Sequence, residues 1–228
     1  MRRAFKALIT LIVVVVLGAA AFIGWYVFGA KVPPKPKLGA ATHETGGPAT
    51  PDGTWHVVPG EHTYVGYRIK ELFGDAIVKR DAVGHTPAVH GTLTIAGTRV
   101  TAADVTADLS SLASDREARD AYVRDNSLET TKFPTARFAL TKPIALPPRA
   151  EKNTELPLRA TGRLLLHGVT RTVTLTLDAR WNGPTIELVG SDPIKLADYR
   201  IKPPHTVIAS VDDHGSLEFD LTFAPGAR

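Results

Sequence analysis

No cysteine occurs among the 228 residues of the sequence. The chain therefore forms no disulfide, carries no thioether-linked lipid anchor, and offers neither a thiol nucleophile nor a thiolate ligand for a metal. His-Glu-x-x-His, Gly-x-Ser-x-Gly and phosphate-loop spacings are absent as well. These absences exclude the enzyme classes that such motifs identify.

The eight histidines are dispersed and form no metal-binding motif. His43 lies in a Pro/Gly-rich stretch, whereas His167 and His214 each precede a glycine in an expected turn. Only the fold could bring the others together as ligands of a metal ion. We therefore predict no metal, no cofactor and no catalytic residue.

One long apolar run stands near the N-terminus. Leu8 to Phe28 are 21 residues without a charge, and as a helix they would extend about 31 Å, close to the thickness of the hydrocarbon core of a bilayer. Trp25 and Tyr26 near its end suit the membrane interface. We predict that residues 1–29 form a cytoplasmic tip and a single-pass transmembrane anchor. The alternative is an export signal cleaved near residues 19–21, which would give a secreted protein.

Residues 30–53 are rich in Pro, Gly, Ala and Thr and show no apolar periodicity, so we predict a linker there. Basic residues flank the apolar run on both sides, and the N-terminal amine tips the balance toward a cytoplasmic N-terminus, which places the C-terminal domain outside the cytoplasm. The formal net charge of +4 owes much to these flanks. It therefore indicates contact with anionic membrane lipids rather than with nucleic acid.

The rest of the chain alternates apolar and polar residues in short runs, as half-buried β-strands do. The clearest example is a hairpin of residues 158–166 and 169–179, between which only His167 and Gly168 intervene. Both residues tolerate the positive φ of a type I′ turn. The eight predicted strands cover residues 64–70, 91–97, 104–112, 135–141, 158–166, 169–179, 185–190 and 216–223. Further turns ending in glycine are predicted at Ala96-Gly97, Asn182-Gly183 and His214-Gly215.

One segment breaks this two-residue period. Ser114 is followed three residues later by Glu117, as in a capping box, and Asp115 and Arg119 stand four residues apart, as in a helical ion pair. The apolar side of the segment is thin. We therefore predict a short exposed helix rather than a core helix.

Eight antiparallel strands with one apolar face can stack as a sandwich or close into a barrel, and closure removes exposed edges. We predict an all-β protein in which residues 54–225 form an eight-stranded antiparallel barrel with one short helix. A barrel of this size either fills with side chains or holds a small ligand. The apolar parity supplies the predicted lipid-binding residues Tyr67, Ile69, Leu93, Phe138, Leu164, Leu166, Leu175, Leu177, Phe219 and Leu221.

Several motifs carry a resemblance to the YceI-like family of lipid-binding proteins. They are "GRLLLHGVTRTVTL" (162–175) and "SDREARDAYVRDNSLETTKFPTARFAL" (114–140), while "WHVVPGEHTYVGYRI" (55–69) and "VHGTLTI" (89–95) fit the first strands of the family. The resemblance implies a lipocalin-like barrel that encloses a long isoprenoid or comparable amphiphile, usually outside the cytoplasm. "LADYRIKPPH" (196–205) departs from the family, which often has an Arg and a Gly around an aromatic residue there, so the ligand's identity stays open.

Arg171 stands three residues after the predicted hairpin turn, on the parity that is otherwise apolar. Its aliphatic stem could carry the guanidinium to solvent at the barrel rim. Alternatively, the guanidinium contacts a phosphate or another polar head of a bound lipid, because its planar fork of donors suits phosphate.

Three hypotheses about function remain: a lipid-binding barrel, an envelope enzyme that uses interior titratable groups, and a structural domain with a filled barrel. Because no strand besides that of Arg171 places a charge inside, we favour binding over catalysis. The predicted partners are an amphiphilic lipid, such as a polyisoprenoid, an isoprenoid quinone, a polyprenyl phosphate or a fatty acid, and the membrane through residues 8–28. Whether the protein forms a homodimer stays open.

Overall fold

The computed structural model describes residues 12–18, 21, 24, 29, 32–41, 46–73, 78–148, 151–204 and 209–226. The chain divides into two compact units, residues 1–33 and 34–228. In the first unit residues 12–18 are helical, and most of the predicted anchor over residues 8–28 lies outside the described residues. Within the ranges just given, no helix is long and apolar enough to cross a membrane. The anchor stays a prediction.

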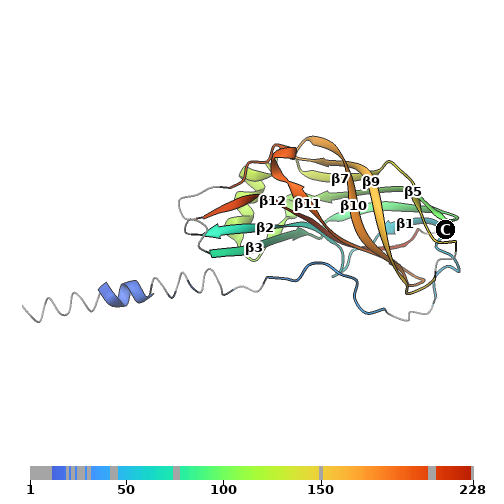
Figure 1. Ribbon diagram of the computed structural model, residues 1–228, viewed down its shortest axis with the longest axis horizontal. Coiled ribbons are helices and arrows are strands. Elements are labelled where there is room, and N and C mark those ends of the chain that lie inside the picture. Colours follow the sequence, from blue (N-terminus) through green and yellow to red (C-terminus); the bar gives the residue numbers. More distant parts are fainter. Residues whose placement is uncertain are drawn as a thin grey trace, which may run out of the picture. The chain divides into compact units, whose positions relative to one another are not determined.

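The second unit contains a β-barrel (Figure 1). Eight antiparallel strands form a ring in the order β1-β4-β5-β7-β9-β10-β11-β12, and pairing of β12 with β1 closes it. The predicted all-β, eight-stranded barrel is confirmed. The strands of the ring are β1 (Gly53–Val57), β4 (Val89–Ala96), β5 (Arg99–Asp108), β7 (Thr135–Leu140), β9 (Glu155–Leu166), β10 (Val169–Trp181), β11 (Ile186–Lys195) and β12 (Ala209–Pro225).

Four further strands extend this ring. β2 (Tyr64–Phe73) pairs with the first part of β12 and with β3 (Val78–Thr86), and β3 pairs with the short β6 (Ala113–Ser114). β8 (Ile144–Ala145) pairs with the start of β5. Figure 1 shows that β2 and β3 reach the end of the barrel opposite to the C-terminus.

Short helical segments close the end of the barrel that β2 and β3 reach, which we call the helical end. They are α2 (Glu117–Tyr122), the π-turn η2 (Val123–Ser127) and the 3-10 turn η3 (Leu196–Tyr199), while η1 (Leu109–Ser111) links β5 to β6. Leu164, Tyr199 and Ile201 form a small buried cluster there, against which Leu128 and Leu166 pack. This cluster separates the barrel interior from solvent at the helical end.

The predicted helix exists, but its predicted capping box is wrong. The N-cap residue is Arg116, which makes no side-chain capping bond. The Ser114 hydroxyl instead donates to Asp120, whose carboxylate is buried, at 2.5 Å. The predicted pair of Asp115 and Arg119 forms. Arg119 also reaches Glu71 on β2, so one side of the helix is bound to the sheet, while Glu117, Ala118 and Tyr122 are exposed as predicted.

One of the predicted turns is confirmed and another is wrong. His167 and Gly168 adopt φ values of 49° and 70° between the paired strands β9 and β10, so this turn is confirmed. The predicted turn at His214-Gly215 is wrong, because both residues lie within β12 next to an irregularity in its pairing with β2. A Cβ atom on Gly215 would lie 2.6 Å from the carbonyl oxygen of Arg68, so the glycine permits close approach of β2.

The outer face of β2, β12, β11 and β10 carries buried ion pairs. Arg68 and Glu218 form a two-point contact of 2.6 and 3.2 Å, and the Arg68 guanidinium also donates to the Pro34 carbonyl oxygen. Arg180 pairs with Glu187 and donates to the Gly39 carbonyl oxygen at 2.7 Å. Part of the predicted linker is therefore bound to the barrel wall. We call residues 34–40 the strap.

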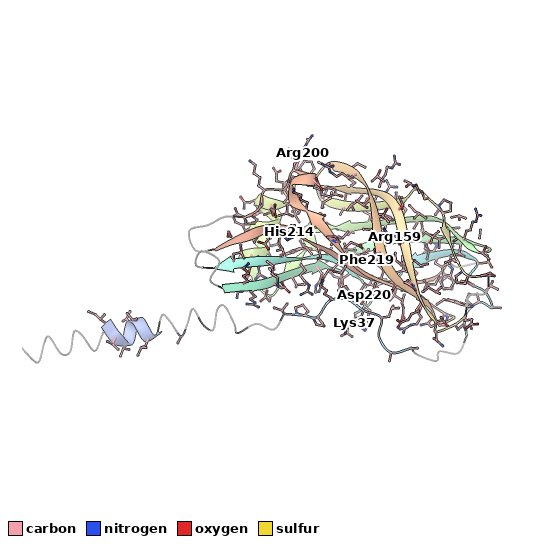
Figure 2. All side chains as sticks on the ribbon, in the orientation of Figure 1. Lys37, Arg159, Arg200, His214, Phe219 and Asp220 are labelled. Atoms are coloured by element: carbon pink, nitrogen blue, oxygen red, sulfur yellow. The ribbon has the colours of Figure 1, made fainter. Side chains whose placement is uncertain are left out.

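Asp220 lies on the same outer face of β12, where burial raises the pKa of its carboxyl to about 6. Glu187 adds to this rise, whereas His62, whose Nδ1 is 3.7 Å from the carboxylate, opposes it. Figure 2 labels Asp220 beside Phe219, its neighbour on β12 that faces the interior. Since the folded state holds the proton more tightly than the unfolded state does, this carboxyl favours folding at low pH, and that contribution is lost as the pH rises through about 6.

We expect Asp220→Asn to raise the melting temperature at pH 8 by about 2 °C or more, because roughly 1 kcal/mol shifts a domain of this size by that amount. The gain should shrink as the pH falls through 6 and vanish near pH 4. Thermal unfolding at pH 8, 6 and 4 measures it. Asp178→Asn is the matched control, because Asp178 is exposed and lies in register with Asp220, two strands away, with Val189 between them. An equal gain at every pH would contradict the titration of Asp220.

Candidate ligand-binding site

The barrel encloses a cavity of about 150 Å³. One water molecule needs roughly 10–15 Å³ of such volume, so the cavity has room for about ten waters. The side chains around it are apolar apart from Arg137 and Arg180. The barrel is therefore hollow rather than filled, and its lining suits a hydrocarbon ligand.

The lining of the cavity extends along the strands of the barrel. Leu217, Phe219, Leu221 and Phe223 on β12 all line it, and the six residue steps from the first to the last span about 20 Å at ~3.3 Å per residue. Half of a bilayer's hydrocarbon core, which one acyl chain fills, is roughly 15 Å thick. The cavity therefore has the length of an extended lipid chain.

The two arginines of the lining direct their charges away from the cavity. The Arg137 side chain is 56 % exposed and pairs with Asp104, and the Arg180 guanidinium is bound to Glu187 and the strap. No Asp, Glu, His, Lys or Tyr is among the lining residues in the described part of the chain. Nor do the described residues include a group of three His, Asp or Glu that could hold a metal ion. The cavity can enclose an apolar chain, but it presents no pair of titratable groups for acid–base chemistry.

Seven of the ten predicted lipid-binding residues line the cavity: Leu93, Phe138, Leu164, Leu175, Leu177, Phe219 and Leu221. The other three lie beyond its end. Tyr67 and Ile69 continue the inner face of β2 toward the helical end, and Leu166 packs in the cluster of Leu164 and Tyr199. Contact of any of the ten with a ligand stays a prediction.

Sequence reasoning missed several lining residues that occupy the same inward parity. Ala160 on β9 and Trp181, the last residue of β10, are both buried against the cavity. The alternation that selected their neighbours also includes them, so the parity signal was present. Trp181 donates its indole N–H to the Gly183 carbonyl oxygen at 2.9 Å, so the cavity wall keeps no unpaired donor there.

A polar cluster lies beyond the end of the cavity that is nearest the helical end of the barrel. Arg119 donates to both carboxylate oxygens of Glu71, at 2.7 and 3.0 Å, and also pairs with Asp115. Asp115 is in turn bound by Arg80, and these contacts hold the pKa of its carboxyl below the ordinary value although burial opposes them. The cluster joins α2 to β2 and β3, which closes the barrel on this side.

Arg171 lies at the rim of the helical end and does not line the cavity. Its Nε donates to the Asp198 carbonyl oxygen at 2.6 Å, and its Nη2 is 3.4 Å from the Asp198 carboxylate. The side chain is 49 % exposed. This position agrees with a guanidinium that reaches solvent at the rim, and contact with a lipid head group stays a prediction.

Comparison with known proteins identifies the same fold. Residues 55–223 match the model of the YceI-like domain, whereas no curated protein matches the chain. A polyisoprenoid-binding domain from Saccharophagus degradans implicated in plant cell wall breakdown superposes with a TM-score of 0.59 and 16 % identity, over 75 % of this chain and 98 % of that one. BcnA of Burkholderia cenocepacia gives a TM-score of 0.52 and 19 % identity, over 68 % of this chain and 95 % of that one.

Proposed function

The chain belongs to the YceI-like family, and from this we propose that its barrel binds one long isoprenoid-like lipid in the apolar cavity. The observation that carries the proposal is the cavity itself: about 150 Å³ of space along four alternate residues of β12, bounded by apolar side chains. The similar domain from Saccharophagus degradans is described as polyisoprenoid-binding. Binding rather than catalysis fits a cavity whose described lining holds no pair of titratable groups.

We further propose that the protein works at the cell envelope. The uncharged residues 8–28 support a single membrane anchor, and only the five residues 29–33 separate that run from the strap. Such an anchor would keep the barrel close to the bilayer, from which a lipid could enter it. The lipid would then be stored, carried or presented to another envelope component.

Native mass spectrometry of the full-length chain, purified without added isoprenoid and released from phosphatidylcholine nanodiscs, tests the binding proposal. We expect one lipid per chain, identified after organic extraction as a long-chain species distinct from the nanodisc phospholipid. A chain that carries no lipid and takes up no added isoprenoid would contradict the proposal and favour a structural role of the barrel.

A further inference from the structure

Two buried hydroxyl groups at the helical end have no hydrogen-bond partner among the residues that the structure describes. They are the Tyr67 hydroxyl on β2 and the Ser127 hydroxyl in η2. Buried polar groups in proteins nearly always have a partner, because an unpaired one loses its bonds to water without replacement. A donor of this kind close to a ligand cavity therefore indicates a contact that the ligand completes.

Tyr67 borders the end of the cavity that is nearest the helical end of the barrel. Val65, two residues earlier on the same face of β2, lines the cavity, and so does Leu217, which is the partner of Tyr67 in the ladder with β12. The Tyr67 side chain is half-buried, so part of it is reachable although its hydroxyl is covered. A ligand that fills the cavity and extends beyond Leu217 meets this ring next.

The position and the proton of the Tyr67 hydroxyl are both fixed. The ring lies against Gly84, where an added Cβ would come within 2.6 Å of it, so no larger residue than glycine fits beneath the tyrosine. Burial raises the pKa of the phenol above its ordinary value. The hydroxyl is therefore a neutral donor over the whole physiological range of pH.

The cations around Tyr67 are already engaged by carboxylates of the protein, which disfavours an anionic head group. Arg119 acts on the phenol more strongly than any single carboxylate, and Asp120, Glu71 and Asp115 oppose it. That guanidinium is already bound by Glu71 and Asp115. Arg171, at the rim of the same end, is bound by Asp198. Asp115 is in addition bound by Arg80 and lies 3.8 Å from Arg116, so the cations of this cluster are already paired. A phosphate or carboxylate would have to compete with these ion pairs.

We propose that Tyr67 donates a hydrogen bond to the head group of the bound lipid, and that this head group is uncharged and bears an oxygen acceptor such as a hydroxyl or a carbonyl. The inference rests on the proposed function, and it sets the orientation of the ligand. The head lies at the helical end beside Tyr67, and the tail extends along β12 toward Phe223 at the other end of the cavity.

Three probes with the same chain test this proposal: geranylgeraniol, geranylgeranyl phosphate and the hydrocarbon that lacks a head group. Each is titrated into the full-length chain, and the signal is the change in tryptophan fluorescence, since Trp181, one of the three tryptophans, lines the cavity. We expect the alcohol to bind more tightly than the phosphate. Tyr67→Phe should weaken binding of the alcohol about two- to ten-fold, the effect of one net hydrogen bond, and leave binding of the hydrocarbon unchanged.

Tyr64→Phe is the matched control, because Tyr64 lies on the same strand but on the opposite face. It should change none of the three affinities. A Tyr67→Phe protein that binds the alcohol as tightly as the parent, or that loses affinity for all three probes alike, would overturn the role of the hydroxyl. Tighter binding of the phosphate by the parent would overturn the uncharged head group. A parent that takes up none of the probes would instead contradict the proposed function.

Discussion

Ala160→Trp is expected to empty the barrel of lipid. Ala160 is 4 % exposed on β9, lines the cavity and faces Leu175 across the ladder. An indole at this position occupies space that the lipid chain needs in a cavity of about 150 Å³. Loss of contact with only two methylene groups costs roughly 1.6 kcal/mol, and 1.4 kcal/mol is tenfold in affinity. A lipid titration followed by native mass spectrometry should therefore show an affinity that is at least about tenfold lower.

Arg159→Trp is the matched control, because Arg159 is the adjacent residue and points to solvent. It adds an indole to the same strand without entering the cavity, so it should keep the full lipid load. Overpacking by Ala160→Trp costs about 1–3 kcal/mol of stability, so circular dichroism should still show a folded barrel. Ala160→Leu, which adds a smaller side chain, should have a lipid affinity between those of the parent and Ala160→Trp. A folded Ala160→Trp protein with all its lipid would show that the lipid binds elsewhere.

The two-residue alternation of the sequence predicts which side chains face the cavity, because a strand exposes alternate residues to opposite faces. Phe219 and Leu221 line the cavity, whereas Asp220 between them lies on the outer face. The same alternation does not show where along a strand the cavity ends. Tyr67 has the inward parity of Val65, yet helix α2 closes the barrel near it, and that packing follows from contacts between distant residues.

The sequence also predicts the number of strands in the ring, but it does not predict which strands form the ring. Residues 64–70 are predicted as one of the eight, yet they belong to β2, and β1 completes the ring. The reason lies in β12, which is 17 residues long and pairs with β2 along its first part and with β1 only at its end. Which strand pairs with each part of β12 depends on long-range pairing that periodicity cannot encode.

Charged residues of outward parity are in general solvated, and two of them depart from this rule. Arg68 and Glu218 have outward parity, yet their side chains are 8 % and 3 % exposed. The strap begins beside Arg68, whose guanidinium donates to the Pro34 carbonyl oxygen at 3.1 Å. A Pro-rich segment without periodicity gives no signal of this docking, so the burial of the pair could be seen only in the structure.

Glu218→Ala is expected to destabilise the fold by about 3–5 kcal/mol, because it leaves the Arg68 guanidinium buried without its main counter-charge. Arg68 would keep the weaker contact with the Asp81 carboxylate, at 3.5 Å, and the bond to the carbonyl oxygen of Pro34 in the strap. Denaturant unfolding of the full-length chain measures the loss. Asp104→Ala is the control, because Asp104 and Arg137 form an exposed pair, 40 % and 56 % accessible, and such pairs contribute at most about 1 kcal/mol.

A double variant separates the buried charge from the packing of the strand. Arg68→Met with Glu218→Leu removes both charges and keeps apolar volume beneath the strap, so it should recover most of the stability that Glu218→Ala loses. Recovery would show that the cost comes from a buried guanidinium that has lost its main counter-charge, and that the strap needs no ion pair beneath it. If the double variant is as unstable as Glu218→Ala, the pair instead holds the strap and β12 in place through its hydrogen bonds, to Pro34 on one side and across β2 and β12 on the other.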